Sequence, residues 1–225
     1  MLMEGYIMQA IMETIFDIGY LVTVIILGVL IIKKAGAQGR EILLFGIMTV
    51  LLGCGDAFHL VPRVYSLWTG DFEANAAALG AGKLVTSITM TVFYTLLFEV
   101  WRRHYGARRG AALSLAVYGL AVVRIGLCLF PQNEWLNYDA PLSWGIYRNI
   151  PFALLGLLMI MLFVREGGKK RDAYRWMWLA VSLSFAFYIP VVLWADTWPL
   201  IGMLMIPKTC AYVWIVVMGW KNTSG

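Results

Sequence analysis

Seven apolar stretches, each close to the length needed to cross a lipid bilayer, dominate the sequence. An α-helix rises about 1.5 Å per residue, so a hydrocarbon layer of about 30 Å takes roughly 20 apolar residues. The stretches are residues 12–32, 42–62, 78–100, 111–131, 149–164, 176–195 and 198–220. Helices satisfy their own backbone polar groups in hydrocarbon. The sequence therefore predicts an all-α fold, a seven-helix transmembrane bundle that forms one domain over residues 1–225.

The composition excludes the main alternatives to a membrane protein. Hydrophobic residues make up 61% of the chain and charged residues only 14%, whereas ordinary globular chains have about a quarter charged residues. A soluble fold could not cover that much apolar surface with so few charges. A soluble enzyme, a disordered chain and a fibrous protein are therefore excluded.

The distribution of the basic residues predicts the orientation. Thirteen of the 18 Lys and Arg residues fall in alternate connections or in the C-terminal tail. They are Lys33, Lys34, Arg40, Arg102, Arg103, Arg108, Arg109, Arg165, Lys169, Lys170, Arg171, Arg175 and Lys221. By the positive-inside rule we expect these segments in the cytoplasm, the N-terminus outside and the protein in the plasma membrane. Because the charges have this topological explanation, we expect no nucleic-acid partner.

Five cations remain that topology does not explain, and each lies in or at the edge of an apolar stretch. They are Arg63, Lys83, Arg124, Arg148 and Lys208. An unpaired charge at the centre of a membrane helix costs about 2.5–3.5 kcal/mol on the most lenient scale. Such residues need partners and are functional-site candidates by default.

Polar side chains accompany these cations at helical spacing. Asp56, His59 and Arg63 follow an i, i+3, i+7 pattern, which places them on one face of the second helix. Further helices carry polar faces of the same kind, made of Lys83, Ser87, Thr91 and Tyr94, of Ser184 and Tyr188, and of Lys208 and Tyr212. These faces predict a polar cavity between the helices that opens outward.

Charge balance suggests what the cavity holds. One interpretation is purely structural, with Asp56 paired to Arg63 or Lys208 and Asp196 paired to Arg148. The five cations, however, outnumber these acids. The surplus favours an anionic guest, and in a membrane we expect a lipid or other anionic amphiphile with a phosphate or carboxylate head. The predicted binding residues are Arg63, Lys83, Tyr94, Arg124, Arg148, Tyr188, Lys208 and Tyr212.

Asp56 and His59 are the candidates for acid–base chemistry. Two ionisable groups one turn apart in a medium of low dielectric can divide acid and base roles between them. Metal binding is not expected, because His104 is predicted on the opposite side of the membrane and Cys54, Cys128 and Cys210 show no metal-ligand spacing. No cofactor motif is present either.

Gly55-Asp56-Ala57 and the following Leu60-Val61-Pro62-Arg63, with Tyr212 in the last helix, resemble the lysoplasmalogenase-like family of small polytopic membrane proteins. The resemblance implies hydrolysis of the vinyl-ether bond of a lysolipid, with Asp56 as one of the intramembrane acids. The family's second Asp, in a late helix, has no counterpart here, where the chain reads Tyr188-Ile189-Pro190-Val191.

Two other classes remain open. A transporter or sensor would bind the anion without breaking a bond. A retinal-type receptor would use Lys208, in the seventh stretch, for a Schiff base.

Overall fold

The computed structural model describes residues 2–106, 110–167, 172–195 and 197–223, and these ranges contain helices and no strands. The long helices are α1 (Leu2–Gln38), α2 (Arg40–Thr69), α3 (Ala76–His104), α4 (Ala111–Leu129), α5 (Leu142–Gly167), α6 (Met177–Trp194) and α7 (Met205–Asn222). Two short 3₁₀ helices, η1 (Pro131–Asn133) and η2 (Pro199–Leu204), precede α5 and α7. Seven helices in the described ranges are long and apolar enough to cross a membrane, which confirms the predicted fold class.

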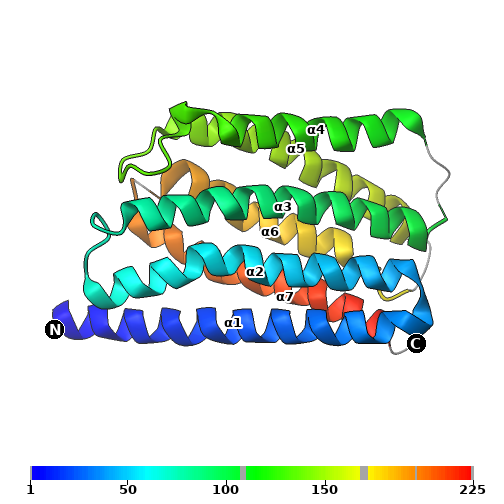
Figure 1. The fold of residues 1–225 in the computed structure, drawn as a ribbon, viewed down its shortest axis with the longest axis horizontal. Coiled ribbons are helices and arrows are strands. Elements are labelled where there is room, and N and C mark those ends of the chain that lie inside the picture. The colour runs from blue at the N-terminus through cyan, green and yellow to red at the C-terminus, as the bar shows by residue number, and fades with distance from the viewer. Residues whose placement is uncertain (1, 107–109, 168–171, 196, 224–225) are drawn as a thin grey trace.

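The helices run alternately up and down along one axis (Figure 1). α1, α2, α3 and α4 follow one another side by side, and α5, α6 and α7 lie behind them, with contacts of α7 to α1 and α2 and of α5 to α3. The N-terminus lies at one end of the bundle and the C-terminus at the other (Figure 1). We call the end with the C-terminus the basic end, because Lys33, Lys34, Arg103 and Lys221 lie there.

Several helices differ in length from the predicted stretches. α5 was expected at 149–164 but runs from Leu142 to Gly167, because Pro151 is accommodated within the helix. The side chain of Asn149, two residues before Pro151, donates to the backbone oxygen of Gly145 at 2.8 Å. α1, α2 and α3 are also longer than their apolar stretches, and the seventh span divides into η2 and α7.

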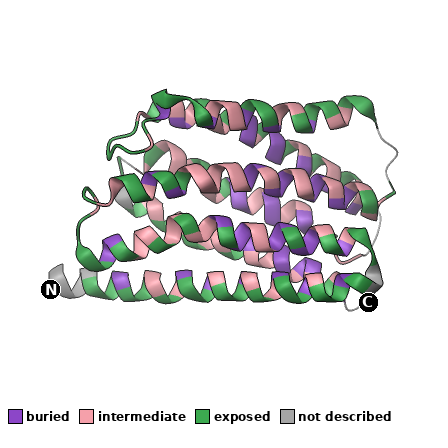
Figure 2. Cartoon of the chain, viewed as in Figure 1, coloured by how far each residue is buried: buried purple, intermediate pink, exposed green. Residues whose placement is uncertain are grey.

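Small residues bring the first helices close together. A Cβ atom added to Gly28 would lie 2.7 Å from Val50, and one added to Gly46 would lie 2.6 Å from Ile32. Glycine therefore allows α1 to pack directly against the backbone of α2, as is common between membrane helices. The outward face of α1 exposes large apolar residues such as Ile15 and Ile26, which suits contact with lipid. Buried residues concentrate inside the bundle (Figure 2).

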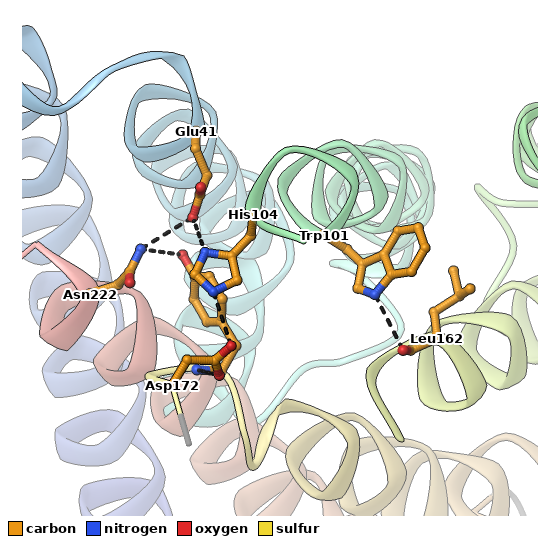
Figure 3. Close-up of polar contacts among 7 residues, drawn as sticks. Glu41, Trp101, His104, Leu162, Asp172 and Asn222 are labelled. Atoms are coloured by element: carbon orange, nitrogen blue, oxygen red, sulfur yellow. Dashed lines mark hydrogen bonds and ion pairs between the residues drawn. The ribbon is translucent and has the colours of Figure 1, made fainter. Parts of the chain in front are cut away.

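A hydrogen-bonded cluster closes the basic end of the bundle (Figure 3). His104, at the end of α3, contacts Glu41 of α2 at 2.9 Å through Nδ1 and Asp172 of the α5–α6 connection at 3.1 Å through Nε2. Asn222 of α7 donates to Glu41 and to the hydroxyl of Tyr174, both at 3.2 Å. We call these five residues the basic-end clasp.

The clasp is well sheltered from water. Tyr174 is fully buried, and burial raises the pKa of its phenol well above the ordinary value, so the group stays neutral at physiological pH. The clasp joins α2, α3, α7 and the α5–α6 connection by polar contacts, and the rings of His104 and Tyr174 also pack edge-on with their centres 4.7 Å apart.

Candidate functional site

A small polar cavity lies between five helices, toward the end opposite the clasp. It is lined by Thr86, Ser87 and Met90 of α3, Arg124 of α4, Phe152 of α5, Tyr188 of α6, and Lys208 and Tyr212 of α7. Its volume is about 40 Å³, room for about three water molecules. Two of the five surplus cations, Arg124 and Lys208, thus reach one cavity, together with Tyr188 and Tyr212.

Arg124 is the most unusual residue of the cavity. Its side chain is only 2% exposed, and among the described residues no acceptor lies within hydrogen-bonding distance of its Nε or Nη1. The guanidinium carbon lies 3.3 Å from the centre of the Phe152 ring, in a cation–π arrangement. Lys208 and several Tyr and Cys side chains act on it electrostatically, and none of these groups is a carboxylate. A buried guanidinium with unused donors is a strong anion-binding element.

Lys208 carries the second charge of the cavity. Its Nζ lies 5.0 Å from the centre of the Tyr188 ring and 5.7 Å from that of Tyr212, so two aromatic faces surround the ammonium group. Asp56 of α2 attracts it electrostatically, although the two form no contact ion pair in the described structure. Asp56 in turn accepts a hydrogen bond of 2.6 Å from the hydroxyl of Tyr20 on α1. We call Arg124, Lys208 and Asp56 the cavity group, although Asp56 lies behind the lining. This group contains two cations and one carboxylate.

The contact between α2 and α3 holds Asp56 in place. Pro62 lacks a backbone N–H, which leaves the carbonyl of Phe58 without its usual helical donor. Gly82 of α3 packs against this carbonyl so closely that an added Cβ would lie 2.2 Å from the Phe58 oxygen. One turn further along, the hydroxyl of Thr86 donates to the backbone oxygen of Gly55 at 3.0 Å. α3 therefore packs closely against the turns of α2 that carry Asp56 and His59.

Aromatic residues separate the cavity from the basic end. Tyr94 is fully buried, and its hydroxyl lies 3.2 Å from that of Tyr212 and 3.4 Å from the Ser184 hydroxyl. Its ring packs edge-on against Phe152 and contacts Phe185. Tyr94, expected as a binding residue, thus reaches the cavity through Tyr212 and is not part of its lining.

The other three surplus cations lie outside the cavity lining. Arg63 forms an ion pair of 2.8 Å with Glu13 of α1. Arg148 donates to Asn133 at 2.9 Å and stacks 4.3 Å from the Trp135 ring centre. Lys83 is exposed near the start of α3. Arg63 therefore does not pair with Asp56, and Asp196, the expected partner of Arg148, lies outside the described residues.

His59 faces the interface of α2 with α3. Its ring forms a hydrogen bond with the backbone of Leu79, while Nδ1 is buried without a partner among the described residues. It shares the helix with Asp56 but is not part of the cavity lining. No group of three His, Cys, Asp or Glu side chains in the described ranges has the geometry of a metal site.

An apolar crevice lies beside the polar cavity. It has a volume of about 160 Å³ and is formed by α5 and α6, mainly by Ile146, Ile150, Ala153, Phe185, Ile189, Val192 and Leu193. Phe152 and Tyr188 line both spaces, so the two are separated by those rings. Tyr188 also donates a hydrogen bond of 2.9 Å to Asn149, which lies in the crevice wall.

Three residues of the site carry no signal in the sequence. Tyr20, Phe152 and Met90 are ordinary members of apolar helices, and only the packing of one helix on another reveals their contacts. Pro151, directly before Phe152, is the local sequence feature that sets this turn of α5 apart.

Sequence comparison finds similarity to an exchanger and to a putative permease. The chain is 27% identical over 162 residues to the sodium/potassium/calcium exchanger 1 of Homo sapiens, covering 70% of this chain and 14% of the exchanger. The exchanger of Bos taurus is 26% identical over the same length, or 12% of that protein. The putative permease IIC component YwbA of Bacillus subtilis (strain 168) is 28% identical over 138 residues, which cover 56% of this chain and 30% of the permease.

The chain thus spans less than a third of each of these relatives. No family model and no solved structure matches it. The resemblance to the lysoplasmalogenase-like family therefore finds no support. Together with the seven apolar helices, the relatives identify the chain as an integral membrane protein.

Proposed function

We propose that this integral membrane protein is a transporter for a monovalent anionic amphiphile, whose charged head binds between Arg124 and Lys208. The observation that carries the proposal is the Arg124 guanidinium, which is buried at the cavity without an acceptor for its Nε and Nη1 groups. An anion would supply the missing acceptor, and charge-assisted hydrogen bonds of this kind are about twice as strong as neutral ones.

The charge of the cavity argues for an anion. The two cations Arg124 and Lys208 exceed the single carboxylate of Asp56, so the group is positively charged whether Asp56 is ionised or protonated, and a singly charged anion is attracted to both forms. The relatives are named as an exchanger of sodium, potassium and calcium and as a putative permease, which supports transport. A metal cation as cargo suits this cavity poorly, because it would be placed beside two positive side chains.

We further propose that Asp56 is the counter-ion of Lys208, in place of the catalytic role that the sequence suggested for Asp56 with His59. Arg63, Lys83 and Arg148 lie at the end of the bundle nearest the cavity. From the positive-inside rule we infer that this end faces away from the cytoplasm.

The apolar crevice between α5 and α6 supports an amphiphilic cargo. Ile150 and Ile189 are 52% and 43% exposed, so the crevice is open toward the surrounding lipid. A tail lying there would remain in apolar surroundings while the head reached Arg124 past the ring of Tyr188. Binding would therefore require Tyr188 to release Asn149.

A series of alkylsulfonates tests this function, because a sulfonate stays ionised and its tail length can be varied. We expect purified protein in nanodiscs to bind methanesulfonate, and hexanesulfonate more tightly, by titration calorimetry. Proteoliposomes should then take up hexanesulfonate faster than protein-free liposomes. Binding without uptake would indicate a sensor, and the absence of binding would contradict the proposal.

The same proteoliposomes separate transport from lysolipid hydrolysis. They would be given lysophosphatidylcholine and its vinyl-ether analogue, and the products would be read by mass spectrometry. We expect both lipids to remain intact. A product that forms with the wild type but not with Asp56→Asn would instead support the hydrolase suggested by the family resemblance.

Filling the crevice should weaken the binding of long tails selectively. Ala153→Phe places a ring in the crevice, and we expect roughly tenfold weaker binding of hexanesulfonate, the equivalent of two buried methylene groups at about 0.8 kcal/mol each. Binding of methanesulfonate should be unchanged. Ala186→Phe, at an exposed position of α6 outside the crevice, is the matched control. Equal losses for both sulfonates would contradict a tail site.

A further inference from the structure

Asp56 is the one carboxylate of the cavity group, and its protonation would change the charge that an anion meets. When Asp56 is ionised, it offsets one of the two cations; when it is protonated, Lys208 and Arg124 act together. An anion therefore binds more tightly to the protonated form. Because binding linkage is reciprocal, the bound anion must also favour the protonated form of Asp56.

α1 provides a row of groups that leads from the end of the bundle to Asp56. Glu13, Asp17 and Tyr20 are spaced i, i+4, i+7 and share one face of the helix. Glu13 pairs with Arg63, and Tyr20 donates to Asp56 at 2.6 Å. Asp17, between them, is 9% exposed, forms no hydrogen bond among the described residues, and interacts electrostatically with both Glu13 and Asp56. Chains of intramembrane carboxyl groups are typical of proton relays.

We propose that the protein couples the movement of its anion to that of a proton, with Asp56 as the proton-binding site and Glu13, Asp17 and Tyr20 as the path to it. The inference rests on the proposed anion site at Arg124. One proton enters from solution by way of Glu13 and Asp17 and forms an O–H bond on the Asp56 carboxylate. The hydrogen bond with Tyr20 then reverses, with Asp56 as donor and the phenol oxygen as acceptor. One proton therefore accompanies one anion.

Several other titratable or charged groups surround Asp56, and an experiment has to distinguish their titration from that of Asp56. Asp17 and Tyr20 face it from α1, Lys208 and Tyr212 from α7, and His59 and Arg63 lie on its own helix, with Lys83 across on α3. Among these, His59 is the group whose ordinary titration range is nearest neutrality. A test of the proposal must therefore distinguish Asp56 from His59.

The test measures proton uptake on binding of methanesulfonate, an anion that does not itself titrate. Protein in weakly buffered nanodiscs would be mixed with methanesulfonate in the presence of a pH indicator, while calorimetry gives the affinity at each pH. In the wild type we expect one proton to be taken up per anion, and the affinity to rise about tenfold per unit fall in pH over the range in which Asp56 titrates. Asp56→Asn should bind without proton uptake and with an affinity independent of pH.

Two further variants complete the design. Glu73→Gln removes an exposed carboxylate of the α2–α3 connection, away from the row, and should behave as the wild type does. Tyr20→Phe keeps the proton site but removes the donor to the ionised carboxylate, so the midpoint of proton uptake should move to higher pH by about one unit. This variant supports or contradicts the role of Asp56 even if Asp56→Asn does not fold.

The outcomes distinguish this inference from the proposed function. Binding with unchanged proton uptake in Asp56→Asn, or with no proton uptake in the wild type, would overturn the coupling and leave the anion site in place. Loss of uptake in His59→Gln together with its persistence in Asp56→Asn would move the proton to His59 and also overturn it. If the wild type binds no methanesulfonate at any pH, the proposed function and this inference fail together.

Discussion

Replacing Arg124 with Gln is expected to weaken anion binding strongly and, at the same time, to raise the stability of the protein. The guanidinium is buried, has no carboxylate partner, and pays a desolvation cost that the cation–π contact with Phe152 offsets only in part. A neutral amide avoids most of this cost. Most substitutions of fully buried residues destabilise a protein, so a gain in stability would be diagnostic of an unsatisfied charge.

The loss of binding should be large. Hydrogen bonds to charged groups contribute about 1.5–3 kcal/mol, so Arg124→Gln should weaken methanesulfonate binding roughly 10- to 150-fold. Saturating methanesulfonate should raise the unfolding temperature of the wild type but not that of the variant, because only a bound ligand stabilises the folded state. Arg124→Lys keeps the charge but loses the planar donor fork, and should fall between the two.

Arg103→Gln is the matched control for this experiment. Arg103 is an exposed arginine at the basic end of α3, far along the helix from the cavity. Its replacement should change neither the affinity for methanesulfonate nor the unfolding temperature by more than a small amount. Wild-type affinity in Arg124→Gln would refute the assignment of Arg124 to the anion.

Gly82→Ala is expected to destabilise the protein strongly. The added methyl group would lie 2.2 Å from the Phe58 carbonyl oxygen and 2.7 Å from the Cα atom of His59. Both atoms belong to the backbone of α2, so neither can rotate away, and the two helices have to separate. Overpacking typically costs about 1–3 kcal/mol, and contacts with rigid backbone lie at or above the upper end of that range.

The measurement is thermal unfolding of the purified protein, with Gly119→Ala as the control. Gly119 lies inside α4, where nothing would approach an added Cβ within 4 Å. Alanine is the better helix former by about 0.8–1.0 kcal/mol, so this variant should be unchanged or slightly more stable. Equal unfolding temperatures for the two variants would show that the close approach of α3 to α2 is not required.

The helices were predictable because hydropathy alone specifies membrane spans. Apolar runs of about 20 residues leave no choice but a helix, and the structure has all seven. The boundaries were less predictable. The fifth helix was expected to begin at residue 149, whereas it begins at Leu142 and continues through Pro151.

The pairing of charges could not be derived from spacing. Arg124, Lys208, Tyr188 and Tyr212 were expected to share a cavity, and the structure brings them together. Arg63, however, turns to Glu13, a residue of another helix. Which helix lies beside which, and in what register, depends on close contacts such as that of Gly28 with Val50. A single sequence does not encode those neighbours in any local pattern.

The basic-end clasp has a consequence for biosynthesis. Glu41 and His104 are 63 residues apart in the chain, and His104 and Asp172 are 68 apart, whereas Glu41 and Asn222 are separated by 181 residues. Because a chain emerges from the ribosome N-terminus first, Glu41 is made long before α7, and its contact with Asn222 forms only after α7 has been inserted. A chain in which α7 had not yet docked would leave Glu41 and Tyr174 without their contacts to Asn222, an exposed polar surface by which quality control would recognise it.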